Sequence, residues 1–260
     1  MTWLPALVST VCLAVYAWQD GIHDCNDGAR YTSRKPQPPP FHRRFHWWPR
    51  LLLQAVTLAS LVALGALMGS PQKTLLLLAL PGAWFVATHP TTTDAPCMLL
   101  AWAASTLLHA AHPVYSVALS LAAGAIHERG PVFAAVYAWH PLPLLGLLAV
   151  QWWARPAKRD ADALVGWPTT WKAIQAHRPY QDLLDGKLPL YGLRVVLPAA
   201  VWWGASRQAW AALGLAMASR VLGTDTCRFL FWAAPPLVVG LPALPWWVVA
   251  VHLVTFQRAI

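Results

Sequence analysis

Apolar windows without a charged residue alternate with short polar stretches along the chain, at 51–72, 74–93, 95–126, 130–154 and 229–257. A helix that spans a bilayer needs about 20 predominantly apolar residues, so several windows are long enough for one helix and some for two short ones. The pattern predicts helices over the ranges 2–18, 51–69, 74–88, 95–110, 114–126 and 131–153, and two further segments, 193–219 and 229–257, that proline or glycine could break.

The window 95–126 is predicted to be a hairpin of two short helices. As a single helix it would be about 48 Å long at 1.5 Å per residue, well beyond the hydrocarbon core of a bilayer. His109, His112 and Pro113 supply two polar side chains and a helix breaker near its middle.

Helix parity then divides the polar segments between the two membrane faces. The loops 19–49, 89–94 and 127–130 fall on one face, and the segment 155–192 falls on the other. The positive-inside rule does not identify the cytoplasmic face, because the first loop and the segment 155–192 are similarly rich in Lys and Arg. Part of the net charge of +9 can therefore meet phosphate, either on anionic lipid headgroups or on a phosphate-bearing substrate.

Composition supports a membrane protein, because 57% of the residues are hydrophobic and only 11% are charged, against about 25% charged residues in soluble domains. Tryptophan pairs such as Trp202-Trp203 and Trp246-Trp247 suit the aromatic belt at the headgroup level, with lipid-facing bulk as the alternative. We expect an all-α, multi-pass integral membrane protein of roughly 7–9 transmembrane helices, some short or broken. One transmembrane domain, 1–260, and no nucleic-acid partner are expected.

Carboxylates gather in the first polar loop, where Asp20, Asp24 and Asp27 lie within eight residues. A basic and aromatic stretch that includes Arg43 and Arg44 follows on the same loop. This order suits a reaction with an anionic leaving group, in which a carboxylate accepts the proton of a nucleophile and arginine stabilises the departing phosphate. The alternative is a solvated loop whose basic end rests on anionic lipid.

Charged residues at three later positions each have a structural and a functional interpretation. Asp94 follows a run of threonines and could cap a helix or belong to a site. Glu128, the only glutamate, adjoins Arg129 between two apolar segments, either as an ion pair or as a substrate clamp. Asp225 and Arg228 share a helical face at i, i+3, as a local ion pair or as phosphate ligands.

A divalent metal is conceivable only by ligand type. The candidate ligands His23, Asp24, Asp27, His42 and His46 follow no known metal-binding spacing. We therefore predict neither a metal nor a cofactor.

Five short motifs follow one another in an informative order: Asp27-Gly-Ala-Arg-Tyr31, Pro40-Phe-His-Arg-Arg44, Thr93-Asp94-Ala95, His127-Glu128-Arg129 and Asp225-Thr-Cys-Arg228. Together they resemble the GT-C class of polytopic glycosyltransferases, which use sugars linked to polyprenyl phosphate. The resemblance runs from the N-terminus to near residue 240. The chain departs from the class in its short length and in having three aspartates in the first loop, where the family relies on one main acid.

The resemblance implies an inverting membrane glycosyltransferase that moves a sugar from a polyprenyl-phosphate donor to an acceptor hydroxyl. Asp27, or else Asp24, would be the general base that activates this hydroxyl against an oxocarbenium-like centre. The active face would be extracytoplasmic, by analogy alone. The residues that the resemblance assigns to substrate or phosphate binding are Tyr31, Arg43, Arg44, Asp94, Glu128, Arg129, Asp225 and Arg228.

A second hypothesis, from another class, is a small ion- or proton-coupled membrane transporter that uses the membrane-edge acids as ion sites. A transporter places its charges near the middle of the membrane, where His140 and Arg207 are the candidates. The position of the acids in loops on one side favours the enzyme.

Overall fold

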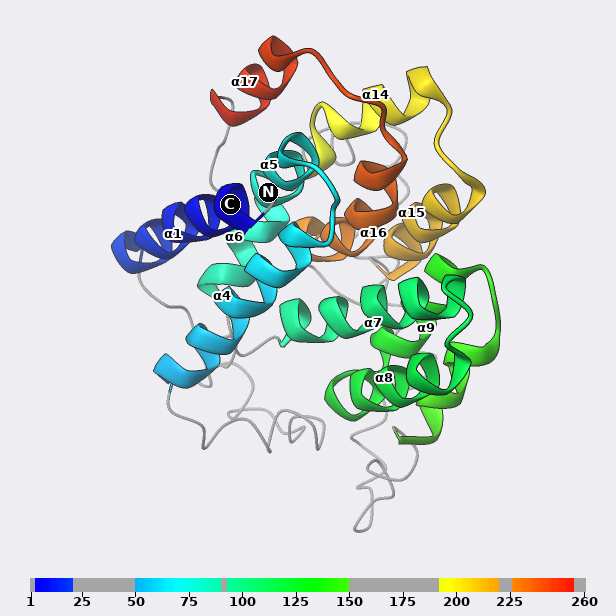
Figure 1. The fold of residues 1–260 in the computed structure, drawn as a ribbon. Coiled ribbons are helices and arrows are strands. Elements are labelled where there is room, and N and C mark those ends of the chain that lie inside the picture. The colour runs from blue at the N-terminus through cyan, green and yellow to red at the C-terminus, as the bar shows by residue number, and fades with distance from the viewer. Residues whose placement is uncertain (1–2, 21–49, 90–92, 150–191, 220–225, 255–260) are drawn as a thin grey trace, which may run out of the picture. The chain divides into compact units, whose positions relative to one another are not determined.

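The computed structural model describes residues 3–20, 50–89, 93–149, 192–219 and 226–254, and every regular element within these ranges is helical (Figure 1). The predicted all-α class is therefore confirmed for this part of the chain. None of the helices described here is both long enough and apolar enough to cross a membrane.

Residue contacts divide the chain into two compact units. The first unit comprises 1–19, 61–85 and 166–260, and the second comprises 20–60 and 86–165. The division falls inside α4 (Arg50–Ala66) and α6 (Pro81–Thr88) and before the last residue of α1 (Trp3–Asp20). The prediction of one domain over 1–260 stays a prediction.

Besides parts of α4 and α6, the described residues of the second unit form three α-helices and one 3-10 helix that pack together. The first two helices pack along each other as a hairpin, the third contacts both, and the 3-10 helix lies against the second and third. These elements are α7 (Asp94–His109), α8 (Pro113–Ile126), α9 (Arg129–Ala138) and η2 (Leu142–Gly146).

The hairpin predicted for 95–126 is confirmed, and the turn follows from local chemistry. α7 ends at His109, and Ala111 adopts a positive φ of 61° that cannot continue a helix. Pro113 then begins α8, a position that proline favours because the amide proton it lacks would have no partner there.

Two glycines set the distance between α8 and η2. A Cβ atom at Gly124 would lie 2.1 Å from the carbonyl oxygen of Gly146, and one at Gly146 would lie 2.3 Å from that of Ser120. Both contacts are with backbone atoms, so a larger residue at either position would push the two elements apart.

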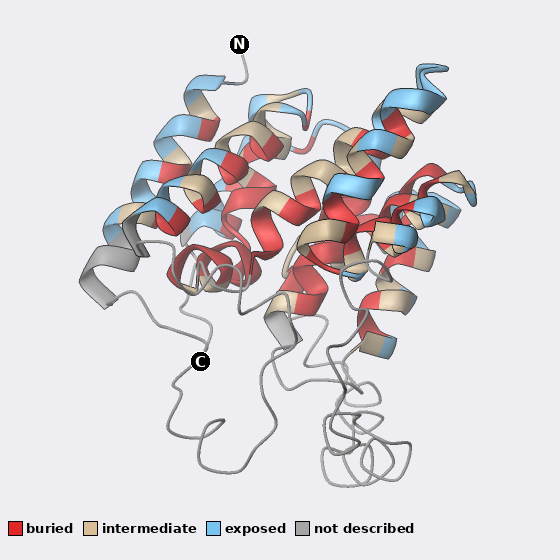
Figure 2. Cartoon of the chain, turned by 90° about the horizontal axis from the view of Figure 1, so that it is seen from below, coloured by how far each residue is buried: buried red, intermediate tan, exposed pale blue. Residues whose placement is uncertain are grey.

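The first unit is arranged around a long buried helix, α16 (Thr226–Gly240). α14 and α15 pack against it, and α5 contacts both α16 and α17. All side chains of residues 229–238 are buried, as the red stretches of Figure 2 illustrate for the unit cores. The other elements of this unit are α1 (Trp3–Asp20), α5 (Pro71–Leu78), α14 (Val196–Trp203), α15 (Arg207–Ser219) and α17 (Trp246–Val254).

Polar side chains of α5 secure the segment that joins α16 to α17. Lys73 donates from Nζ to the carbonyl of Val239 at 2.6 Å, and Gln72 donates from Nε2 to that of Leu244 at 3.0 Å. These bonds satisfy carbonyl groups at and beyond the end of α16, which have no partner within the helix.

Two predicted helices are wrong in their extent because proline breaks them. The predicted helix over 131–153 is interrupted, because α9 ends at Ala138, before Trp139 in a left-handed conformation (φ 51°) and Pro141, and η2 follows at Leu142. The range 74–88 is divided between α5 and α6, and Pro81 begins the latter. Proline disfavours a helical residue before it and lacks the amide that continues a helix.

The breaks foreseen in the two C-terminal segments are confirmed. Gly204, with a φ of 74°, separates α14 from α15. The segment 241–245 separates α16 from α17. Arg207 is consequently the first residue of α15 and not the middle of a longer helix.

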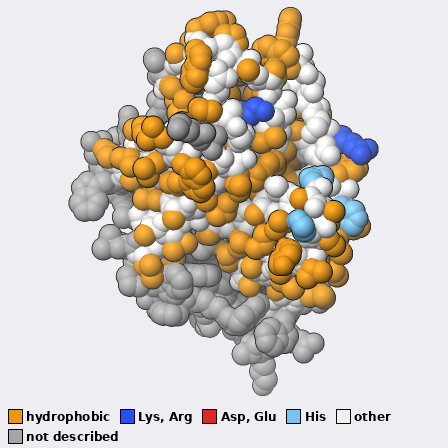
Figure 3. Space-filling model, in the orientation of Figure 1, with side chains coloured by type: hydrophobic (Ala, Val, Ile, Leu, Met, Phe, Trp, Pro, Cys, Tyr) orange, Lys and Arg blue, Asp and Glu red, His pale blue; other side chains and the backbone are white. Residues whose placement is uncertain are grey.

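Hydrophobic side chains cover much of the described surface in Figure 3. Both tryptophan pairs within the described part of the first unit are exposed: Trp202 is 82% exposed and Trp203 50%, while Trp246 is 60% and Trp247 70% exposed. Single exposed apolar residues are ordinary on proteins, but large adjacent aromatic ones indicate a surface made for contact.

Candidate functional site

Among the described residues of the second unit, three are predicted site residues: Asp94, Glu128 and Arg129. Arg228 belongs to the first unit. The other predicted site residues lie outside the described ranges, and their roles stay predictions: Asp24, Asp27, Tyr31, Arg43, Arg44 and Asp225.

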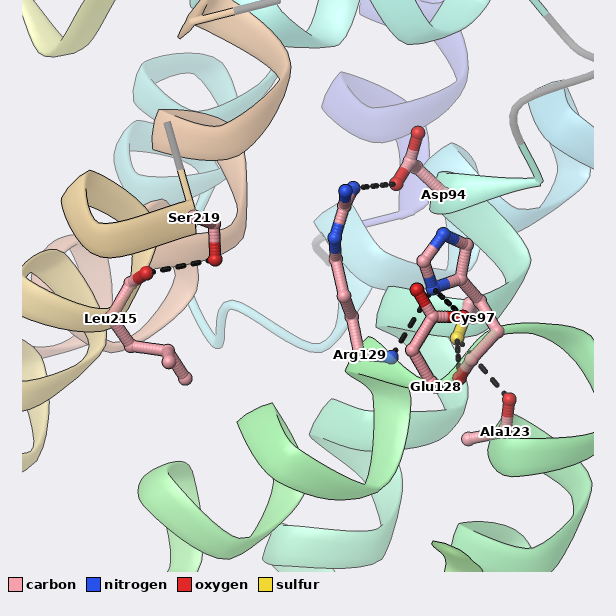
Figure 4. A network of polar contacts seen from close by, with 8 residues as sticks. Asp94, Cys97, Ala123, Glu128, Arg129, Leu215 and Ser219 are labelled. Carbon is pink, nitrogen blue, oxygen red and sulfur yellow. Dashed lines mark hydrogen bonds and ion pairs between the residues drawn. The ribbon is translucent and has the colours of Figure 1, made fainter. Parts of the chain in front are cut away.

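Asp94 and Arg129 face each other across the starts of two helices. Asp94 begins α7 and its side chain has no exposed surface, while Arg129 begins α9 and its side chain is 19% exposed. The distance from Arg129 Nη1 to Asp94 Oδ1 is 3.9 Å, and Figure 4 shows the arginine extended toward the carboxylate. The helical hairpin explains this meeting, because α8 returns the chain to the start of α7.

The alternative interpretation of Asp94, a helix cap, is not supported. The N-cap of α7 is Thr93, which has a left-handed φ of 56° and makes no side-chain cap hydrogen bond. The backbone carbonyl of Thr93 accepts the bond from the Cys97 amide. Asp94 instead stands in the first helical turn, where the helix dipole favours a carboxylate.

Glu128 does not use Arg129 in the way that the simplest interpretation suggested. Its carboxylate Oε2 lies 3.2 Å from Nδ1 of His127, and its side chain is 56% exposed. The Arg129 guanidinium turns instead to Asp94. The two adjacent charges thus have different neighbours, one at the surface and one inside.

His127 shapes the turn that presents Arg129. Its side chain is buried, and Nδ1 accepts a hydrogen bond of 3.2 Å from the Arg129 amide. The first amides of a helix have no partner within the helix, and Glu128, the N-cap of α9, makes no side-chain cap bond. His127 therefore takes the place of a cap side chain at the start of α9.

Cys97 ties this turn to α7, one helical turn after Asp94. Its buried thiol donates to the carbonyls of Ala123, at 3.4 Å, and His127, at 3.7 Å. Gly130 allows this approach, because a Cβ there would lie 2.7 Å from the Cys97 sulfur. The main chain of the turn and the start of α7 are thus held together beneath the ion pair.

Sequence reasoning did not single out His127 and Cys97 as parts of the site. A signal for His127 existed in its place directly before two charges at the end of an apolar segment. No signal distinguished Cys97 from an ordinary small buried residue. Its role depends on the carbonyls of Ala123 and His127, which lie near the far end of the hairpin in the sequence.

Arg228 stands in the first turn of α16, with its guanidinium carbon 5.9 Å from the centroid of the Phe229 ring. This distance is at the limit of a cation–π contact. The predicted pairing with Asp225 involves a residue outside the described ranges, so it stays untested.

The arrangement in the second unit places a buried guanidinium nitrogen, Nη1 of Arg129, beside a buried carboxylate. A guanidinium presents five N–H donors in a planar fork that matches phosphate oxygens. Within the described ranges no three potential ligands gather to hold a metal ion, and the candidate set His23, Asp24, Asp27, His42 and His46 lies outside them. In comparisons with known proteins, no family model, no curated protein and no solved structure matches the chain.

Proposed function

We propose that the protein is a multi-pass membrane glycosyltransferase that moves a sugar from a polyprenyl-phosphate donor to an acceptor hydroxyl with inversion. The observation that carries the proposal is the contact between Asp94 and Arg129, two residues from separate motifs of the resemblance. A transferase of this kind needs a fixed positive charge beside the phosphate of its donor, and we assign this role to Arg129.

The Asp94 carboxylate holds the guanidinium of Arg129 in position. Burying a carboxylate is costly unless it is paired, and the side chain of Asp94 has no exposed surface. At 3.9 Å the contact is longer than a charge-assisted hydrogen bond of about 2.7–2.9 Å. Asp94 therefore holds the guanidinium in place electrostatically, and the planar fork of a guanidinium matches the oxygens of a phosphate.

The membrane part of the proposal rests on composition and on exposed aromatic surface. The large exposed fractions of Trp202, Trp203, Trp246 and Trp247 suit the headgroup zone of a bilayer. An active face on the extracytoplasmic side follows from the family analogy alone.

In the proposed reaction, Asp27 or Asp24 removes the proton of the acceptor hydroxyl as its oxygen attacks the anomeric carbon. The bond between this carbon and the phosphate oxygen breaks on the opposite face, which inverts the configuration. Arg129, together with Arg43 or Arg44, would stabilise the negative charge that grows on the lipid phosphate.

The transporter remains the second candidate, because a fully buried carboxylate such as Asp94 is also what a proton-coupled site requires. The two proposals differ in what happens to a labelled sugar. A transferase links it covalently to an acceptor, whereas a transporter leaves it chemically unchanged.

The test uses membranes from cells that produce the full chain and a polyprenyl-phosphate donor with a radiolabelled sugar. We expect Arg129→Gln to reduce label transfer by about 10²–10³-fold, the usual effect of removing one donor to a developing anion. Arg207→Gln is the matched control, since Arg207 also begins a helix but is exposed, and it should transfer as the unmodified protein does. Transfer that depends on Arg207 and not on Arg129 would contradict the proposal.

A further inference from the structure

One nitrogen of His127 has two neighbours that require opposite states of that nitrogen. Nδ1 lies 3.2 Å from the amide nitrogen of Arg129 and 3.2 Å from Oε2 of Glu128. Toward the amide it must offer a lone pair, and toward the carboxylate it must offer a proton. It cannot do both at once.

We propose that His127 is a positioning residue that holds Arg129 in place while its ring is neutral and releases it when the ring is protonated. In the neutral ring with its proton on Nε2, Nδ1 accepts from the Arg129 amide and fixes the first residue of α9. In the imidazolium, Nδ1–H donates to Glu128 and the Arg129 amide loses its partner. This inference rests on the proposed function only where it is tested by sugar transfer.

The change at His127 is transmitted through short, described contacts. Arg129 carries both the amide that His127 binds and the guanidinium that faces Asp94. The carbonyl of His127 accepts from the Cys97 thiol on α7, three residues after Asp94. A shift of the turn therefore moves one end of the ion pair relative to the other.

Several ionisable groups surround the switch, and they oppose one another. Glu128 favours the protonated ring, and Arg129, on the same turn, disfavours it. Asp94 and Cys97 are the described ionisable groups that α7 contributes nearby. Only Glu128 among them is largely exposed, so its carboxylate can accept a hydrogen bond from the protonated ring while most of it stays in contact with water.

Two substitutions separate the acceptor role of His127 from its protonation. An asparagine side chain readily accepts from the amide two residues further along the chain, so His127→Asn preserves the bond to Arg129 but cannot be protonated. His127→Phe keeps a ring and removes the acceptor. His140 supplies the control, because its Nδ1 accepts from the Leu142 amide at 3.1 Å in the same two-residue arrangement, at an exposed position.

Label transfer is measured over a range of pH for these variants in the full chain. We expect His127→Phe to reduce transfer at neutral pH by about 10²-fold, the effect of misplacing a site group by about 1 Å. His127→Asn should transfer at neutral pH as the unmodified protein does, and it should lack the loss of transfer that we expect of the unmodified protein as the pH falls. His140→Phe should change neither quantity. Equal effects of His127→Phe and His140→Phe, or an unchanged acidic loss in His127→Asn, would overturn the inference.

A measurement without activity keeps the inference separate from the proposed function. In protein with ¹⁵N-labelled histidines, the signal that disappears in His127→Asn identifies His127. We expect an unprotonated Nδ1 at neutral pH and a protonated one after acidification. A protonated Nδ1 at neutral pH would refute the positioning role, even if sugar transfer is confirmed. The expected spectrum without any transfer by the unmodified protein would refute the proposed function alone.

Discussion

A carboxylate without exposed surface stays ionised only if its surroundings replace the water that it has lost. For Asp94 the helix dipole at the start of α7 and the guanidinium of Arg129 do this together. Neither contribution requires a short hydrogen bond, which agrees with the separation of 3.9 Å. The helix dipole and the guanidinium thus both contribute to the burial of this acid.

Single substitutions can identify which aspartate is the proposed general base. Asp27→Asn should reduce sugar transfer by about 10²–10⁴-fold, because the amide keeps the shape of the side chain but cannot accept a proton. Asp24→Asn is the matched control and should have a smaller effect. Initial rates with the labelled donor, at equal amounts of folded protein, decide between them.

The opposite result, an inactive Asp24→Asn and an active Asp27→Asn, would move the base to Asp24. Full activity in both variants would exclude the mechanism as written, whatever the role of Arg129.

Among the elements, helix existence was largely predictable from the sequence and helix ends were not. The hairpin of α7 and α8 follows from the length of an apolar window and from Pro113, both visible in the sequence. The end of α9 at Ala138 depends on Trp139 taking a left-handed conformation, which the apolar pattern of the segment conceals. Periodicity shows where a helix is favourable, and proline and backbone conformation decide where it stops.

For the candidate site, the sequence identified residues but not their contacts. Asp94, Glu128 and Arg129 were identified because charges are rare in this chain. Their actual partners were not, since the neighbour of Arg129 in sequence is Glu128 but its neighbour in space is Asp94. Such a choice depends on the register between α7 and α9, which no local pattern specifies.

The close approach of α8 and η2 gives a prediction at the scale of elements. Gly124→Ala should destabilise the protein by about 1–3 kcal/mol, because the new methyl group would overlap the Gly146 carbonyl and overpacking has costs of this size. Gly214→Ala is the control: a Cβ there meets nothing within 4 Å, and alanine is the better helix former by about 1 kcal/mol. Thermal unfolding in detergent should therefore shift downward for the first variant and not for the second. An unchanged or raised midpoint for Gly124→Ala would show that α8 and η2 can separate without loss.

For the whole molecule, the number of membrane crossings between the polar loops decides whether the separate motifs lie on the same face. The acids of the first loop, Asp94 and Glu128 can serve one reaction only if the segments 19–49, 89–94 and 127–130 face the same side of the membrane. The contact between Asp94 and Arg129 is compatible with this arrangement for two of the three segments, and the first loop lies outside the described ranges.

Cysteine labelling tests the topology of the full chain. Thr32→Cys, Thr92→Cys and Thr170→Cys are introduced singly into a variant whose four natural cysteines are replaced by alanine, and a membrane-impermeant maleimide is applied to sealed vesicles of known orientation. Positions 32 and 92 should react from the same side and position 170 only after the vesicles are opened, or the reverse in inverted vesicles. Because one missing or additional crossing between the first loop and the segment 155–192 changes the parity, labelling of all three positions from one side would rule out the topology on which a shared active face depends.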